Sequence, residues 1–243
     1  MMSPDLVAVY YTSNRLDAKR PHFAKAVRDQ LLKSLDGEFP IITVSHEPLD
    51  FGDKNVVIGP VERSHLQIYR NVLHGAIAAA SAFAAAPYIA LCEDDALYTR
   101  GHFRTHRPPA HKFAYDFNKW GMNTWNDPPV FGYRARAVIN HLIAPRKLLI
   151  ESLNERFHKF KDVPDSEIPI QWWGDLGRYE RKLGCTPREW EPFAAPEPGL
   201  VFSHEEAFGF LNQGARKSAG GARRTELPGW GTAQQMVDLW NEK

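Results

Sequence analysis

Three consecutive acidic residues, Glu93, Asp94 and Asp95, directly follow the apolar segment Tyr-Ile-Ala-Leu-Cys at residues 88–92. Adjacent carboxylates repel one another, and a hard divalent cation held by one or two of them and by ligand phosphates would compensate this charge. A solvated acidic turn, or Asp95 as the N-cap of a following helix, would explain the same residues. The pattern alone leaves these interpretations open.

Two further residues could join such chemistry. His204 follows a late apolar segment at residues 200–202, and in a chain with ten histidines an ordinary polar or core role is the simpler interpretation. If the late strand lies beside the acidic strand, a neutral imidazole there could complete a site for Mn²⁺ or a similar ion. Asp175 stands between glycines and aromatic residues, where it is either the N-cap of a helix or a general base in an apolar pocket.

Basic residues gather in two stretches. Residues 100–112 hold four Lys or Arg side chains and three histidines, with aromatic residues between and beside them. Residues 212–225 are rich in glycine and basic side chains and contain no acid, which suits a mobile loop that closes over a diphosphate. A solvated surface loop is the simpler explanation of both stretches.

The elements that position these residues begin with a regular first half. The pattern predicts strands at 6–11, 40–45, 55–58 and 88–91, and helices at 17–35 and 64–86, the second with Ser64 as its N-cap. This order predicts an α/β fold with a mostly parallel sheet and a ligand site beyond the carboxyl ends of its strands. The second half is less regular. Residues 101–129 predict loops, followed by a strand at 130–133, helices at 145–160 and 173–183, and a strand at 199–202.

Composition narrows the class of protein. The chain has 243 residues, of which 43% are hydrophobic and 24% charged, as in ordinary globular proteins. Thirty basic residues nearly cancel twenty-nine acidic ones, so the basic excess of a phosphate-backbone binder is missing. The longest apolar run, at residues 76–86, is about half of the roughly 20 residues that span a bilayer, and no signal-peptide pattern opens the chain. We therefore expect a cytoplasmic protein with no membrane contact.

Several motifs are missing from the sequence. It contains no GxxxxGK[ST], GxGxxG, GxSxG or HExxH pattern, which disfavours P-loop NTPases, dinucleotide oxidoreductases, α/β-hydrolases and zincins. Its two cysteines, Cys92 and Cys185, form neither a disulfide framework nor a CxxC metal motif.

In chain order, these elements resemble the GT-A fold glycosyltransferases, which use nucleotide-diphospho-sugar donors. The resemblance covers most of the chain but rests on short motifs: LVAVYYTSN at 6–14, Arg70-Asn71 in a helix, and Glu93-Asp94-Asp95 in place of the DxD motif. It implies a single GT-A domain over 1–243, with a mostly parallel central sheet flanked by helices. Residues 1–100 would be the nucleotide-sugar-binding half, 101–211 the acceptor half, and 212–243 a mobile basic loop and a C-terminal helix.

The resemblance also implies roles for individual residues. Glu93, Asp95 and His204 would hold Mn²⁺ or Mg²⁺, and Asp175 would be the catalytic base that deprotonates the acceptor if the anomeric centre is inverted. If the centre is retained, Asp175 would only position the substrate. The donor would be bound by Tyr10, Thr12, Asn14, Arg70, Asp94, Lys217, Arg223 and Arg224. Glu93 replaces the usual first Asp and Gly174-Asp175 replaces the usual acidic pair, which leaves the metal geometry and the base open.

Segments 113–120, 144–150 and 173–180 look like a subgroup of small phage-type enzymes linked to the glycosylation of hydroxymethylated pyrimidines in DNA. This narrower resemblance implies a DNA acceptor, the host cytoplasm as location and no obligate protein partner. Lys and Arg would contact phosphate while aromatic side chains stack on a flipped base. The acceptor residues would be Arg104, Arg107, Trp120, Trp125 and Trp173.

Two alternatives remain open at this point. A nucleotidyltransferase also uses carboxylates at a strand end and a metal, but it forms a nucleotide-sugar and pyrophosphate instead of consuming the nucleotide-sugar. A nucleic-acid-binding module would use residues 100–125, and its affinity would fall steeply with salt. The near-neutral net charge and the acidic run count against this second alternative.

Overall fold

Strand β1 (Leu6–Tyr11) lies near the middle of the larger of two main sheets in the computed structural model, which describes residues 4–62, 64–133, 135–168, 173–205 and 221–242. In these ranges the larger sheet has seven strands in the order β10-β6-β9-β4-β1-β2-β3. The other strands are β2 (Ile41–Ser45), β3 (Lys54–Val57), β4 (Tyr88–Glu93), β6 (Lys112–Asp116), β9 (Leu142–Pro145) and β10 (Glu189–Phe193). Only β9 runs antiparallel to its neighbours. The predicted α/β fold with a mostly parallel sheet is confirmed.

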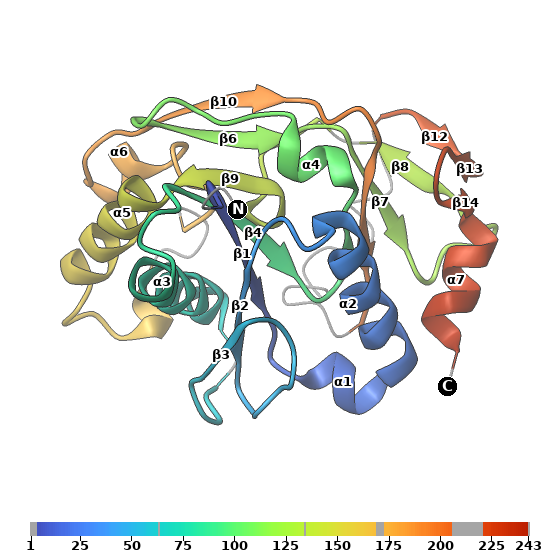
Figure 1. The fold of residues 1–243 in the computed structure, drawn as a ribbon, viewed down its shortest axis with the longest axis horizontal. Coiled ribbons are helices and arrows are strands. Elements are labelled where there is room, and N and C mark those ends of the chain that lie inside the picture. Colours follow the sequence, from blue (N-terminus) through green and yellow to red (C-terminus); the bar gives the residue numbers. More distant parts are fainter. Residues whose placement is uncertain (1–3, 63, 134, 169–172, 206–220, 243) are drawn as a thin grey trace.

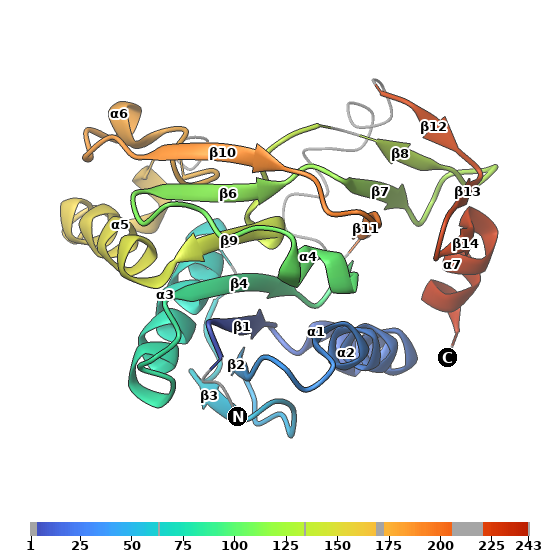
Figure 2. The same ribbon diagram turned by 45° about the horizontal axis from the view of Figure 1, so that its top comes forward.

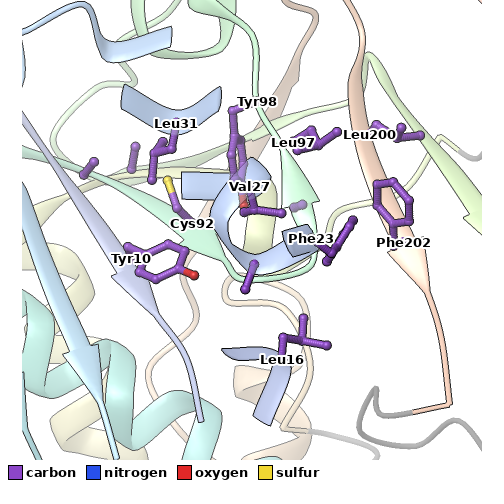
Figure 3. Packing of buried hydrophobic residues seen from close by; sticks show 14 of the residues in the cluster. Tyr10, Leu16, Phe23, Val27, Leu31, Cys92, Leu97, Tyr98, Leu200 and Phe202 are labelled. Carbon is purple, nitrogen blue, oxygen red and sulfur yellow. The ribbon is translucent and has the colours of Figure 1, made fainter. Parts of the chain in front are cut away.

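Helices cover both faces of this sheet (Figures 1 and 2). Every residue of β1 is buried, as expected for a parallel strand between two helical layers. Its alternate side chains Leu6, Ala8 and Tyr10 pack with α2 (Pro21–Leu35), as Figure 3 shows for Tyr10. The other three pack on the side of α3 (His65–Ala82) and α5 (Arg146–Lys159).

The first half folds close to prediction, with one break. The predicted helix 17–35 is divided into α1 (Arg15–Lys19) and α2, because Pro21 starts a new helix and Arg20 before it takes a non-helical φ of −140°. Ser64 is the N-cap of α3 as predicted, and its hydroxyl accepts a hydrogen bond from the Gln67 amide at 3.0 Å.

The second sheet was not predicted. In the described ranges it has the order β12-β8-β7-β11-β5. Its strands are β5 (Ala96–Leu97), β7 (Lys119–Asn123), β8 (Phe131–Tyr133), β11 (Gly199–Ser203) and β12 (Arg223–Arg224). Strands β6 and β7 and the short helix α4 (Arg100–Arg104) replace the loops expected at 101–129. Leu97, Leu200 and Phe202 of this sheet pack against α2 (Figure 3), so the two sheets share a core.

The predicted helix 173–183 is wrong over most of its length. Only α6 (Glu180–Leu183) is helical there, and Asp175 lies in the turn before it. Gly177 takes a φ of +88°, which a continuous helix does not allow. A short 3₁₀ turn, η1 (Ile139–His141), directly precedes β9, and a second one, η2 (Asp165–Glu167), follows α5.

The chain ends with a two-stranded ribbon of β13 (Glu226–Leu227) and β14 (Gly231–Thr232), followed by α7 (Ala233–Asn241). The expected C-terminal helix is therefore present. A capping box closes its start, with Thr232 and Gln235 exchanging hydrogen bonds. Of the helices in the described ranges, none is both long enough and apolar enough to span a bilayer.

Candidate functional site

The acidic run lies at the carboxyl end of β4, at the edge of the sheet where a parallel α/β fold binds ligands. Glu93 ends the strand, and both of its carboxylate oxygens accept hydrogen bonds. Tyr11 donates to Oε1 at 2.8 Å, and Asn140 donates to Oε2 at 2.7 Å. The next carboxylate, Asp94, accepts from the Thr12 hydroxyl at 2.6 Å. The loop is therefore ordered by neutral donors.

These carboxyl groups are hard to ionise where they lie. Burial, followed by the charge of Asp95, raises the pKa of Glu93 to about 8. The same two causes raise the pKa of Asp94 to about 7. A cation bound beside these groups would favour their ionised forms.

Strand β11 returns beside this run, which is the condition that makes His204 a candidate ligand. Val201 and Leu200 pair with Ala96 and Leu97 of β5, the strand that follows the acids directly. The ladder continues as the Phe202 amide donates to the Asp95 carbonyl at 2.9 Å. His204 then reaches Asp95, with Nε2 lying 3.4 Å from Oδ2. The late strand thus brings residues 109 positions apart into contact.

The residues present fit a metal with two protein ligands. In the described ranges no group of three His, Cys, Asp or Glu side chains is placed to hold an ion. The second oxygen of Asp95, Oδ1, is buried and accepts no hydrogen bond from any described group. One carboxylate and one imidazole suit Mn²⁺ or Mg²⁺ when ligand phosphates and water supply the remaining positions. Glu93 fits less well, because both of its oxygens are already hydrogen-bonded.

Helix α7 fixes the orientation of His204. The ring of Trp240 lies 4.6 Å from the imidazole, between centroids, and also packs on Phe23 and Phe202. Arg20 stacks over the same indole at 4.9 Å. The sequence analysis did not single out Trp240. Only its place on the apolar side of a C-terminal helix, with Ala233 and Val237, could have pointed to it.

A cavity of about 320 Å³ opens on the second sheet. Its floor is one face of strands β7, β8 and β11. Alternate residues of these strands face the cavity instead of the core: Lys119, Gly121, Asn123, Gly132, Val201 and Ser203. Its walls come from the β7–β8 turn and from residues 136–140. Asn140 connects the two features, because it lines the cavity and donates to Glu93.

Asp175 lies in a half-buried turn near this cavity. Its carboxylate pairs with Arg178 at 3.0 Å, and it interacts electrostatically with Lys119 and Arg136 of the cavity wall. Burial raises its pKa, although both arginines oppose the shift. Because Tyr179 is the residue that precedes α6, the N-cap interpretation of Asp175 is wrong. A carboxylate with a raised pKa is compatible with a general base.

The predicted donor residues divide into those at the site and those away from it. Thr12 holds Asp94, and Asn14 ties the loops after β1 and β2 together by accepting from the amides of His46 and Glu47. Tyr10 is fully buried and packs edge-on against Phe51. Arg70 is held on the outer side of α3 by two 2.7 Å hydrogen bonds to Asp165.

The predicted basic donor residues lie near the end of the chain. Arg223 lines the cavity, and the Arg224 guanidinium lies 5.6 Å from the ring centroid of Trp120. Lys217 lies outside the described residues, as does most of the basic loop expected around it.

Most of the predicted acceptor residues lie elsewhere. Trp173 is fully buried between Phe157, Phe160 and Tyr69, so its ring has no surface to offer a ligand. Trp120 is among the residues that line the cavity, although its side chain belongs to the core cluster and is 9% exposed. Trp125 is 41% exposed in the turn that follows β7.

The basic stretch is neutralised by neighbouring acids. Arg104 binds Glu38, and Arg107 binds Asp5 at the amino-terminal end of β1. Since the acidic run lies at the carboxyl end of the neighbouring parallel strand β4, Arg107 belongs to the opposite edge of the sheet. These two arginines and Trp173 are therefore not brought to the cavity.

No protein-family model matches the chain, and no curated protein matches it in sequence. Among solved structures, one similar chain is a glycosyltransferase involved in the glycosylation of the major capsid of PBCV-1. It has 9% identity and a TM-score of 0.48, and the match covers 79% of this chain and 82% of that one. Another is the catalytic domain of Drosophila β1,4-galactosyltransferase 7 in complex with xylobiose, with 11% identity and a TM-score of 0.37. That match covers 78% of this chain and 64% of that one.

Proposed function

We propose that this chain is a metal-dependent glycosyltransferase of the GT-A type, which moves a sugar from a nucleotide-diphosphate donor to an acceptor hydroxyl. The observation that carries the proposal is the meeting of Asp95 and His204 at 3.4 Å. This pair lies at the carboxyl end of a central parallel strand, and Asn140 links the same strand end to an open cavity. The motif resemblance expects a carboxylate and a late histidine together at this position.

In this proposal Asp95 and His204 would hold Mn²⁺ or Mg²⁺, and the ion would supply Lewis-acid stabilisation of the leaving diphosphate. Tyr11 and Asn140 keep the Glu93 side chain turned inward, and Thr12 does the same for Asp94. If the anomeric centre is inverted, Asp175 takes the proton of the acceptor hydroxyl. The new bond then joins the acceptor oxygen to the anomeric carbon, and the bond from that carbon to the diphosphate oxygen breaks.

The direct test is Asp95→Ala. This variant should lose the metal-dependent release of nucleotide diphosphate from a nucleotide-sugar while its melting temperature stays close to that of the unsubstituted protein. Asp162→Ala is the matched control, because that carboxylate is 86% exposed on the surface. Full turnover by Asp95→Ala in the presence of EDTA would contradict the metal assignment.

The donor can be identified by a thermal-shift panel of nucleotide diphosphates and their sugars, with and without Mn²⁺. A ligand that binds only the folded state raises the melting temperature, so one nucleotide that acts only with metal would identify the donor base. A nucleotidyltransferase would instead form a nucleotide-sugar and release pyrophosphate when it is given a nucleoside triphosphate and a sugar phosphate.

For the acceptor, the motif resemblance supports a hydroxymethylated pyrimidine in DNA. Hydroxymethylated and plain DNA of one sequence are the substrates to compare, and transfer to the modified strand alone would support this acceptor. A simple nucleic-acid-binding module is not favoured, because Arg100, Arg104, Arg107 and Lys112 all pair with acidic side chains.

A further inference from the structure

Two glycines face each other on the floor of the cavity without a structural need for glycine. Gly121 of β7 pairs directly with Gly132 of β8, and both line the cavity. In the described part of the chain, a β-carbon added to Gly121 would meet only the Gly132 carbonyl oxygen, at 3.7 Å. One added to Gly132 would meet only the Gly121 carbonyl oxygen, at 4.0 Å. Both distances are ordinary van der Waals contacts.

The backbone does not require these glycines either. Neither residue is among the glycines with positive φ in the described ranges. Glycine weakens the interior of a strand, and it often marks a place where a ligand approaches the backbone closely. The pair therefore keeps the floor bare, and the space above it is the cavity itself.

Cationic groups surround this bare floor. Lys119, Arg136 and Arg223 line the cavity together with one acid, Asp127, and the nearby carboxylate of Asp175 interacts with Lys119 and Arg136. Lys119 is 5% exposed, and its ammonium group donates to the carbonyl oxygens of Asp116 and Arg136. Burial lowers its pKa to about 8, so the amine still carries its proton at neutral pH.

The cavity also has a direction. Strand β11 runs parallel to β7, so Ser203 and Asn123 lie at the end that leads to His204, while Lys119 lies opposite Gly199 at the other end. A ligand over the glycine pair would thus have one end near the Asp95–His204 pair and the other near Lys119 and Arg136.

We propose that this cavity binds an acceptor that carries an anionic group, a phosphate or a carboxylate. Its flat or unbranched part lies on Gly121 and Gly132, and its anionic group meets Lys119 and Arg136. This inference rests on the proposed function, because it assigns the cavity to the second substrate of the transfer. Charge-assisted hydrogen bonds from Arg and Lys are the strong contacts by which proteins hold such anions.

The test uses glucose 6-phosphate, glucuronate and glucose as probes, with affinity measured by calorimetry at constant ionic strength. The two anions should bind and glucose should not, and the stronger of the two anions identifies the group. Arg136→Gln should lower the affinity for the anionic probe by about tenfold or more, because it removes one charge-assisted hydrogen bond. Arg100→Gln is the matched control, because Arg100 pairs with Asp36 and Glu38 on the surface.

The glycine floor has its own test. Gly121→Val should fold with a melting temperature no lower than that of the unsubstituted protein, because valine favours strands. The variant should nevertheless no longer bind the anionic probe. If it fails to fold, Gly132→Ala serves in its place. Glycine variants that bind the probe as tightly as the unsubstituted protein would overturn the proposal, as would equal binding of neutral glucose.

The source of the anion is settled by competition. If metal-free pyrophosphate displaces the probe, the cations belong to the donor diphosphate and the acceptor assignment fails. The proposed function is judged separately on the unsubstituted protein, by whether a nucleotide diphosphate raises its melting temperature only with Mn²⁺. The two ideas can therefore fail independently.

Discussion

Replacing Glu180 should destabilise the protein strongly, because it leaves a guanidinium buried without its counter-charge. Arg156 is fully buried and Glu180 is 3% exposed, and the two form an ion pair. Arg156 also donates to the Gly174 carbonyl at 3.1 Å, and Glu180 accepts from the Gly177 amide at 2.9 Å. Breaking a pair this deeply buried costs about 3–5 kcal/mol. We therefore expect Glu180→Gln to lose that amount of unfolding free energy.

The assay is urea denaturation of Glu180→Gln, Arg156→Met and a double variant that combines Arg156→Met with Glu180→Leu. Arg156→Met with Glu180→Leu removes both charges, so it should recover most of the loss seen in Glu180→Gln. Exposed Glu151→Gln on α5 is the control and should cost little, since its pair with Lys147 is on the surface. A loss below about 1 kcal/mol in Glu180→Gln, the size of a surface pair, would refute the reasoning.

This pair also matters for the site, because its two hydrogen bonds hold the turn that carries Asp175. In a glycosyltransferase assay at a temperature where Glu180→Gln stays folded, the variant should lose turnover as well as stability. Stability loss with unchanged turnover would mean that the turn does not need this clamp.

Two further predictions concern packing and acid stability. Gly75→Ala should destabilise by about 1–3 kcal/mol in the same denaturation assay, because its β-carbon would lie 2.3 Å from Val9 Cγ1 where α3 packs on β1; a neutral result would show that helix and strand separate freely. Burial alone would raise the pKa of Asp116, but its hydrogen bond to His102, the charges of His102 and His141 and the Ala195 amide together bring it to about 2. A folded pKa below the ordinary value of 3.8 contributes stability above that pH, about 2 kcal/mol, which is lost as the pH falls from about 4 through 2. The melting temperature of Asp116→Asn should therefore depend less steeply on pH across this range than that of the unsubstituted protein. Equal pH dependence in the two proteins would rule out Asp116 as the source of the acid-labile stability.

The spacing of apolar residues predicts those elements whose apolar side chains all face the core. β1, β2 and α5 lie within a residue of their predicted bounds, because each is buried on the faces that its apolar residues mark. The helix at 17–35 was right in type but missed its break, although Pro21 was visible in the sequence.

In the second sheet, the strands predicted at 130–133 and 199–202 are present as β8 and β11, but β7 escaped prediction because one of its faces is not core. Strand β7 alternates Trp120 and Met122, which point into the core, with Lys119, Gly121 and Asn123, which line the cavity. Such a mixture of glycine, amide and charge is typical of a loop, so residues 101–129 were taken for one. Edge strand β10 failed for a related reason, since it is mostly exposed and contains Pro192. In β7, the residues that hid the strand are the ones that line the cavity.

From the sequence, the site could be predicted only on the condition that two distant strands lie side by side. Sequence order could state that His204 matters if its strand returns beside the acids, but pairing between residues so far apart depends on the whole sheet. Trp173 shows the reverse case. An aromatic residue beside a candidate acid suggested a substrate platform, and the structure places it in the core between α3 and α5.

The net charge of +1 hides two different arrangements of charge. The basic stretch at 100–112 is balanced side chain by side chain, since Arg104 and Arg107 each pair with a carboxylate. The acidic run is not balanced in this way. In the described ranges no Lys or Arg forms an ion pair with Glu93, Asp94 or Asp95, and these carboxylates contact Tyr11, Thr12, Asn140 and His204. Neutral donors order these carboxylates, and burial together with their mutual repulsion raises the pKa values of the first two. Under the proposed function, a cation bound at the Asp95–His204 pair would offset this repulsion.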